Sequence, residues 1–255
     1  MSQNERKKSG GQVRSAGLKR QPFFPFVKGI LRLFRKRVKI INLAGEIDGT
    51  SIILSNHVAM SGPLIHELYF PLLTVKWGAG EMLGNYKMRF DYMRNVFYMQ
   101  KKGYGKARAT FLATFVAMFS KAFYRGMRVI PTWHDARLMK TVVKSVDLLK
   151  EGTPILIFPE DSGDGYHDVL TGFLAGFVTL AEVYYKKTGQ RVPVYPVYYH
   201  KKANTMVIGQ PRFVQDFAEQ GLTREQIAAE FCKIVNGLRE QYFPDGGDAR
   251  KKNGK

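Results

Sequence analysis

The stretch TPILIF, residues 153–158, decides the fold class of this chain. It is short and apolar on both faces, which is typical of a strand buried inside a parallel sheet. A helix is predicted before it, with an N-cap at Asp135 and an end at Gly152, because apolar residues recur between them at near-helical spacing. A second helix is predicted from Phe173 up to Gly189, after an acid-rich and glycine-rich loop at residues 159–168. The stretch is therefore one strand in an alternation of strands and helices.

The same alternation continues on both sides of this unit. An apolar, β-branched run at residues 50–55 ends at Asn56 and His57, and Pro63 indicates the first turn of a helix that reaches Phe70. The remaining predicted elements are strands at residues 192–199 and 207–209 and a helix opened by a capping box of Thr223 and Gln226.

This order of elements predicts an α/β fold, with a single layered domain over residues 41–244 and a largely parallel sheet flanked by helices. Ligands of such sheets bind outside the carboxyl ends of the strands. The polar loops at residues 56–62 and 159–168 both follow predicted strands. We therefore expect these two loops to lie side by side and to form the site.

The charge of the chain is concentrated near its beginning. The 255 residues carry a net charge of +19, and residues 1–40 hold twelve Lys or Arg with Glu5 as their one acid. Residues 1–21 contain almost no large apolar side chains and are predicted to form a disordered basic arm, and residues 245–255 a disordered basic tail. We find neither the apolar core of a signal peptide nor the roughly 18 consecutive apolar residues of a membrane-spanning helix.

Residues 22–40 predict an amphipathic membrane-interface helix. Such a helix lies in the headgroup layer, attracted to an anionic membrane surface by its charge and held by its apolar side chains. This predicts a peripheral protein on the cytoplasmic side of the cell membrane. The alternative is a first helix that packs its apolar side on the core. The apolar side comprises Phe26, Val27, Ile30, Leu31, Leu33 and Phe34, and the basic side Lys28, Arg32, Arg35 and Lys36.

Several function classes are excluded at this stage. Cys232 is the one cysteine, so neither a disulfide framework nor a zinc site built from several thiolates is expected. No glycine-rich phosphate loop is followed by Lys and Ser or Thr, and no nucleic-acid recognition motif occurs, so nucleic acid is not an expected partner. Asp161, Asp164, His167 and Asp168 lack the spacing of an EF-hand, and no metal is expected.

The motifs that carry chemistry occur in a distinctive order. The tripeptide Ser-Asn-His follows a predicted strand and ends at His57. The imidazole of His57 can accept a proton from a hydroxyl near neutral pH. GMRVIP follows at residues 126–131, IFPE at 157–160 and VPVYPV at 192–197. From about Thr50 to Pro211, this series resembles the glycerolipid acyltransferases, the lysophosphatidate (1-acylglycerol-3-phosphate) acyltransferase-like family.

The resemblance implies an O-acyltransferase of phospholipid biosynthesis. An acyl thioester of coenzyme A or of acyl carrier protein would be the donor, the hydroxyl of a lysophospholipid or related lipid the acceptor, and no cofactor is implied. His57 matches the general base that deprotonates this hydroxyl. The residues implied in substrate binding are Asn56, Glu160, Ser162 and Arg128.

Two positions depart from the family's pattern. Gly62 stands where the family has the Asp that orients the catalytic His, and Gly163 stands where it has an Arg. Without an orienting carboxylate an imidazole is a weaker base, and without the Arg a phosphate loses its usual bidentate partner. Either another acid orients His57, or the activity is lost or changed. The candidates for this acid are, in order, Asp161, Asp164 and Glu67. Either the phosphate of the acceptor is bound by Lys101, Lys102 or Arg128 in place of the missing Arg, or the acceptor lacks a phosphate.

Other interpretations stay open. The chain is either this enzyme or a lipid-binding protein that has the acyltransferase-like fold and has lost catalysis through Gly62. Ser162 lacks the Gly-x-Ser-x-Gly elbow, so a hydrolase ranks below direct acyl transfer. Residues 109–119 form either a core helix or, through Phe111, Phe115, Met118 and Phe119, the wall of an acyl-chain groove or a contact with lipid.

Overall fold

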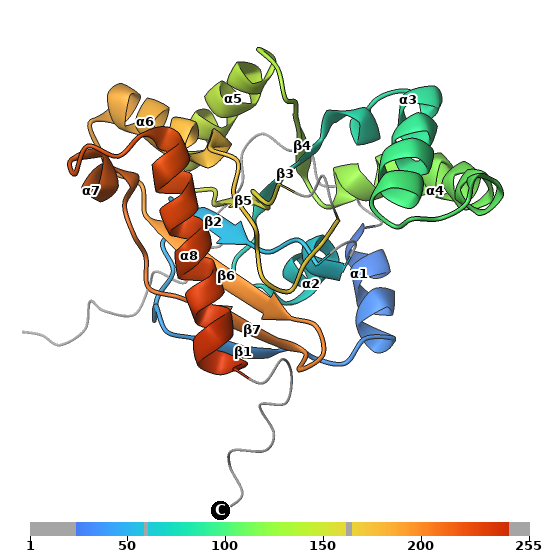
Figure 1. Ribbon diagram of the computed structural model, residues 1–255, viewed down its shortest axis with the longest axis horizontal. Helices are drawn as coiled ribbons and strands as arrows, with labels where there is room; N and C mark the ends of the chain where they lie inside the picture. Colours follow the sequence, from blue (N-terminus) through green and yellow to red (C-terminus); the bar gives the residue numbers. More distant parts are fainter. Residues whose placement is uncertain (1–23, 59–60, 162–164, 245–255) are drawn as a thin grey trace, which may run out of the picture.

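The computed structural model describes residues 24–58, 61–161 and 165–244, and its strands form one sheet with helices on both faces (Figure 1). The strand order is β1-β7-β6-β2-β5-β3-β4, and β6 and β7 are the one antiparallel pair of neighbours in this sheet. The predicted α/β fold with a largely parallel sheet is confirmed. The strands are β1 (Lys39–Asn42), β2 (Ile52–Ser55), β3 (Val75–Ala79), β4 (Val129–Thr132), β5 (Ile155–Ile157), β6 (Val194–His200) and β7 (Thr205–Ile208).

The helices fall into two layers and a group at one edge of the sheet. One layer packs on the face to which Ile52 and Leu54 of β2 point, and α2 packs on the other face, to which Ile53 points. α1 lies against α2, and the edge group lies beside β3 and β4 (Figure 1). The first layer is α5 (Leu138–Lys150), α6 (Gly176–Thr188), α7 (Val214–Ala218) and α8 (Arg224–Tyr242); the others are α1 (Phe24–Leu33), α2 (Ser61–Tyr69), the 3-10 helix η1 (Gly80–Leu83), α3 (Tyr86–Asp91), the π-helix η2 (Tyr92–Gln100) and α4 (Lys106–Gly126).

The central strands follow from their sequences. All residues of β2 and β5 are buried because helices cover both faces of the sheet, which explains why both read as continuous apolar runs. The capping box at the start of α8 is also confirmed, since Gln226 N–H donates to Thr223 Oγ1 at 3.3 Å and Thr223 N–H donates to Gln226 Oε1 at 2.8 Å.

Two predicted helix boundaries were wrong. The helix expected over residues 22–40 ends at Leu33, and residues 39–42 form the edge strand β1 instead, where Lys39 to Asn42 pair with β7. The N-cap of α5 is Arg137, not Asp135, whose carboxylate accepts the Arg137 N–H at 2.9 Å in a turn before the helix. The disordered arm predicted for residues 1–21 and the tail predicted for 245–255 lie outside the described residues.

Candidate active site

His57 lies where β2 ends at the middle of the sheet. The side chain of Asn56 extends the pairing of β2 with β6, because its amide nitrogen donates to Tyr199 O at 2.9 Å and its oxygen accepts from Tyr199 N–H at 2.7 Å. Val58 has a φ of 45°, in the left-handed region that β-branched residues rarely adopt. The buried amide of Asn56 and the strained turn at Val58 thus fix where the backbone of His57 lies.

Gly62 packs directly on the carbonyl group of His57. Its N–H donates to His57 O at 3.1 Å, and a Cβ atom at this position would lie 2.1 Å from that oxygen and 2.8 Å from the carbonyl carbon. A side chain does not fit there while the backbone stays in place. The carboxylate that the resemblance implies at this position is therefore excluded by the path of the chain from β2 into α2.

The imidazole of His57 is held between aromatic rings. The ring of Tyr166 stacks on it, with centroids 4.9 Å apart and planes inclined by 21°, and Phe158 meets it edge to face at 5.1 Å. Lys101 Nζ lies 5.2 Å from the centroid of the Tyr166 ring. Phe158 directly precedes the loop after β5, and Tyr166 lies within that loop. The two loops expected to form the site therefore meet at His57.

Glu160 connects the same two loops through a backbone contact, since its Oε1 accepts the N–H of His57. Burial raises the pKa of Glu160 to about 7, against the opposing effects of this hydrogen bond and of Lys101. Burial likewise lowers the pKa of Lys101, while the carboxylates of Glu160 and Asp161 act in the opposite direction. A carboxyl group that titrates near neutrality thus lies on the backbone of the candidate base.

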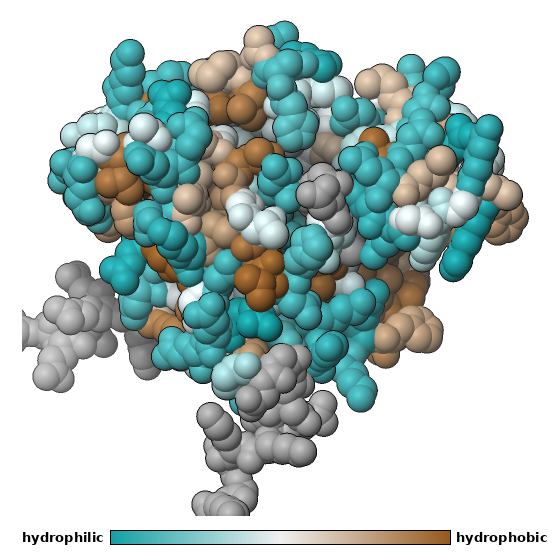
Figure 2. Space-filling model, in the orientation of Figure 1, coloured by the Kyte–Doolittle hydropathy of each residue, from teal (hydrophilic) through white to brown (hydrophobic). Residues whose placement is uncertain are grey.

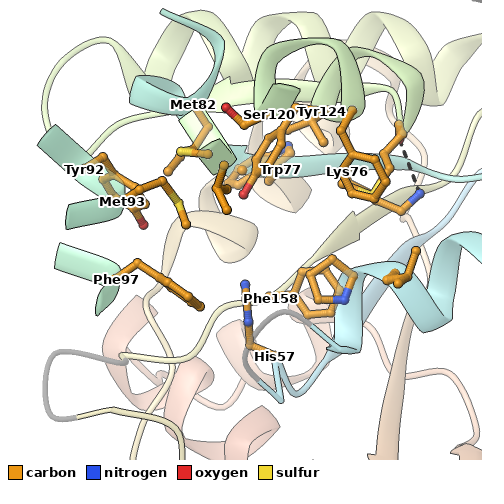
Figure 3. A pocket seen from close by; sticks show the side chains of 18 of the residues that line it. His57, Lys76, Trp77, Met82, Tyr92, Met93, Phe97, Ser120, Tyr124 and Phe158 are labelled. Carbon is orange, nitrogen blue, oxygen red and sulfur yellow. Dashed lines mark hydrogen bonds between the residues drawn. The ribbon is translucent and has the colours of Figure 1, made fainter. Parts of the chain in front are cut away.

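A cavity of about 500 Å³ opens beside His57. Figure 3 shows the imidazole pointing into it from one side, with Phe97 and Phe158 around the ring and Met82, Met93 and Trp77 across the cavity. Its volume lies in the roughly 300–1,000 Å³ range of ligand pockets, and its lining is mostly aromatic and aliphatic. The other lining residues are Pro63, Leu64, Lys76, Gly78, Ala79, Tyr92, Phe115, Val116, Phe119, Ser120, Phe123, Tyr124, Met127, Val129 and Tyr166.

The cavity lies between His57 and its neighbours on one side and η2 and α4 on the other, beside β3. Phe115 and Phe119 line it and are 53% and 67% exposed, so it borders the surface of α4. At another wall, Phe24 of α1 packs behind Met127 and Phe123, and its ring lies 6.0 Å from that of Phe123. Residues 109–119 therefore combine both arrangements, since Ala109, Ala113 and Ala117 are buried in the core while Phe115 and Phe119, but not Phe111 or Met118, line the cavity.

A buried charge cluster lies behind the cavity wall. Glu67 accepts from Lys28 Nζ at 2.6 Å and from Lys76 Nζ at 2.5 Å, and Arg128 Nη2 lies 4.0 Å from the same carboxylate. Burial lowers the pKa of Lys76 to about 8, although Glu67 opposes this shift. Burial raises the pKa of Glu67, but Lys76 and Lys28 together hold it below its usual value. The next residue, His66, has its pKa lowered to about 3 by burial and by Lys76, and is neutral.

Two residues that the sequence proposed for the site, Glu67 and Arg128, belong to this charge cluster instead. Both oxygens of Glu67 accept hydrogen bonds from lysines, so its carboxylate belongs to this cluster. Arg128 is buried with a φ of 56° at the start of β4, beside Glu67, and is not among the described residues that line the cavity. Arg128 and Glu67 are thus brought together with Lys76, which lines the cavity, whereas neither of them does.

The remaining candidates lie in the loop after β5 or outside the described residues. Asp161 is exposed, its N–H donates to Gly172 O at 3.2 Å, and its charge acts on Lys101. His167 and Asp168 are exposed on the surface, and Lys102 is exposed with Nζ 6.0 Å from the Phe97 ring. Ser162, Gly163 and Asp164 lie outside the described residues.

Sequence reasoning missed two residues of the site. Tyr166 is the one aromatic residue within the loop at residues 159–168, and this isolated ring among acids and glycines was an available signal. Lys76 interrupts the apolar run Val75-Lys76-Trp77, and a charge in such a run indicates either a surface strand or a buried ion pair. The structure has the second arrangement.

α1 turns its basic side toward the body and its apolar side outward. Lys28 bonds to Glu67, and Arg32 donates to Leu68 O at 2.6 and 3.1 Å, whereas Leu33 and Phe34 are both 83% exposed. Figure 2 shows hydrophobic surface over α1, on the right of the view. The alternative in which this helix packs its apolar side on the core is therefore wrong.

No helix among the described residues combines the length and the apolar character needed to cross a bilayer. Among the described residues, the large apolar side chains that are more than half exposed lie on α1, at Phe34 just after it, and on α4, where they include Phe111 and Met118.

Comparison with models of known protein families and with curated proteins found no match. Among solved structures, the chain is similar to the 1-acyl-sn-glycerophosphate (LPA) acyltransferase PlsC from Thermotoga maritima, with 15% identity, a TM-score of 0.44, and coverage of 85% of this chain and 77% of that chain. This similarity is too distant to assign an activity.

Proposed function

We propose that this protein is an O-acyltransferase that moves a fatty acyl group from a thioester to the hydroxyl of a lysophospholipid or related lipid. One observation carries the proposal: the imidazole of His57 points into a mostly apolar cavity of about 500 Å³. A base at the wall of such a cavity can meet a hydroxyl and the carbonyl carbon of a bound acyl chain together. The order of motifs that resembles the glycerolipid acyltransferases supports the same activity.

In the proposed reaction, His57 takes the proton of the acceptor hydroxyl as its oxygen attacks the thioester carbonyl carbon. A tetrahedral intermediate forms with the negative charge on the former carbonyl oxygen. Its collapse breaks the C–S bond, and the departing thiolate of coenzyme A or acyl carrier protein receives the proton from the imidazolium. The products are an ester and a free thiol, and no cofactor takes part.

The orientation of His57 rests in this proposal on its neighbours rather than on a carboxylate at residue 62. Tyr166 and Phe158 restrict rotation of the imidazole, and Glu160 and Asn56 hold its backbone. These are positioning residues, because they act through His57. Asp161 is the first candidate for an acid that assists the base, followed by Asp164.

The apolar cavity is the proposed site of the acyl chain. Its lining from η2 and α4, including Phe97, Val116 and Phe119, removes methylene groups from water, and each buried methylene contributes about 0.8 kcal/mol. Since the cavity borders the exposed face of α4, an acyl chain can enter from a lipid phase that covers this face.

We propose that the protein acts as a peripheral protein on the cytoplasmic side of the cell membrane. The exposed apolar side chains of α1, with Leu33 and Phe34 at its end, would insert into the headgroup region of an anionic surface. The net charge of +19 favours the anionic lipids of the cytoplasmic leaflet. This placement brings the cavity to the surface that holds the lipid acceptor.

The test is an acyl-transfer assay with palmitoyl thioesters of both carriers, against lysophospholipids and neutral hydroxyl lipids. His57→Ala is expected to abolish transfer, and His167→Ala, which removes an exposed histidine, is the matched control and is expected to leave it unchanged. Transfer at the wild-type rate by His57→Ala would refute the assignment of the base.

A second candidate function is lipid binding without catalysis, and the packing of Gly62 on His57 favours it because no carboxylate fits at that position. The same assay separates the two. A wild-type protein that binds vesicles containing a lysophospholipid, yet transfers no acyl group from either thioester, would replace the enzyme by the binding protein.

A further inference from the structure

A second concave site lies at the end of α2 away from His57. It is a groove of about 770 Å³ between the end of α1, the segment that leads into β1, and the last residues of α2. Pro63 and Leu64 at the start of α2 line the cavity beside His57, so the two sites lie at opposite ends of this helix. The residues that line the groove are Arg32, Arg35, Arg37, Val38, Ile40, Leu68, Tyr69 and Phe70.

The charge of this arginine groove is of one sign. Arg32, Arg35 and Arg37 all line it, and no acidic side chain of the described residues does. Like charges brought together without an acid raise the free energy of the folded protein, and a bound anion offsets this cost. Guanidinium groups bind phosphate through two parallel hydrogen bonds, so a phosphate group is the anion that this set fits best.

Hydrogen bonds hold the backbone of Arg35 and Arg37 and the side chain of Arg32 in place. Arg32 donates twice to Leu68 O, Tyr69 Oη donates to Arg35 O at 3.2 Å, and Asn204 Nδ2 donates to Arg37 O at 3.0 Å. A site that is already ordered loses less conformational entropy when a ligand binds. The groove is thus built for binding before the ligand arrives.

The side chains next to the groove indicate which phosphate it takes. Leu33 and Phe34 lie between Arg32 and Arg35 in the sequence, and both are 83% exposed. When these apolar side chains enter the acyl layer of a bilayer, the neighbouring guanidinium groups lie at the level of the lipid phosphates. We propose that the arginine groove binds the phosphate-bearing headgroup of an anionic phospholipid of the bilayer, separately from the lipid acceptor beside His57.

This inference rests on the membrane association proposed above, and vesicle binding tests it. The variant is Arg35→Gln/Arg37→Gln, and the matched control is Lys140→Gln/Lys144→Gln, which removes the same charge from exposed positions on α5. The probes are phosphatidylcholine vesicles that contain phosphatidate or phosphatidylserine at equal surface charge. The first variant removes two basic residues from the surface and is expected to weaken binding to phosphatidate vesicles roughly thirtyfold. The control is expected to change it little.

The competing outcomes are distinguishable. Equal losses of vesicle binding from the two double variants would show a diffuse basic surface and overturn the groove. Binding of inorganic phosphate that matches the vesicle affinity would show a site for a free anion and overturn the lipid headgroup. A wild-type protein that binds none of the vesicles would overturn the proposed membrane association together with the groove, whereas acyl transfer in detergent would remain a separate result.

Discussion

The substitution Gly62→Asp restores the acid of the catalytic motif in sequence, and we predict that it destroys the site in structure. A Cβ atom at residue 62 would lie 2.1 Å from the carbonyl oxygen of His57, where contacts under 3.0 Å do not occur. The carbonyl would have to move by about 1 Å. The hydrogen bonds of Asn56 to Tyr199 and of His57 N–H to Glu160 hold this segment where it is.

The size of the effect follows from these contacts. Overpacking costs about 1–3 kcal/mol, and the loss of two hydrogen bonds adds about 1 kcal/mol each. Replacing a helical glycine by alanine returns up to about 1 kcal/mol. Gly62→Ala and Gly62→Asp are therefore both expected to lower the free energy of unfolding by about 2–4 kcal/mol, which corresponds to a melting temperature lower by about 5–15 °C at this chain length.

Thermal and urea unfolding measure the stability, and the acyl-transfer assay measures the activity. Gly237→Ala in α8 is the matched control, because nothing lies within 4 Å of a Cβ atom at that position, and it is expected to be neutral or stabilising. A Gly62→Asp protein that is as stable as the wild type and transfers acyl groups faster would refute the reasoning.

Three further predictions concern separate parts of the molecule. Glu160→Gln keeps an acceptor for the His57 N–H, and it is expected to raise the free energy of unfolding by about 3 kcal/mol above pH 7. Burial raises the pKa of Glu160 from 4.5 to about 7, so the stability of the wild type falls as pH rises from 4.5 to 7. The gain in stability of the variant should therefore vanish below pH 4.5. Urea unfolding that shows the same gain at all pH values would contradict this. Ser120→Phe fills part of the cavity. It is expected to lower kcat/KM for palmitoyl donors relative to decanoyl donors by about fourfold for each excluded methylene. Equal losses of kcat/KM for both donors would place the acyl chain elsewhere. Leu33→Ser/Phe34→Ser is expected to weaken vesicle binding at least about tenfold and to leave the melting temperature unchanged, because both side chains are exposed; a protein that unfolds earlier would show that they pack on the body.

The central strands could be predicted because their signal is local. β2, β5 and β6 are buried on both faces, and their sequences are mostly apolar. β3 was missed because Lys76 breaks its pattern, and the partner that allows this charge to be buried, Glu67, lies on another element. The edge strand β1 was missed because its pairing with β7 depends on residues far along the chain.

Local sequence signals were also insufficient for parts of the candidate site that depend on distant residues. The order of the motifs predicted that His57 and Glu160 would lie together, since both follow neighbouring parallel strands. The stacking of Tyr166 depends on the path of a loop, which periodicity does not describe. For α1, the sequence predicted two sides but not which one faces the body, because that choice depends on Lys28 reaching the buried Glu67.

The pairing of the strands has a consequence for how the chain is made. β2 pairs with β6, and β1 with β7, so the earliest strands obtain these neighbours only from the last third of the sequence. During synthesis, the apolar run of β2 leaves the ribosome long before β6 exists, and such exposed strands are prone to aggregate. We expect this protein to depend on chaperones while it is translated, and to refold slowly from denaturant with a strong dependence of yield on concentration.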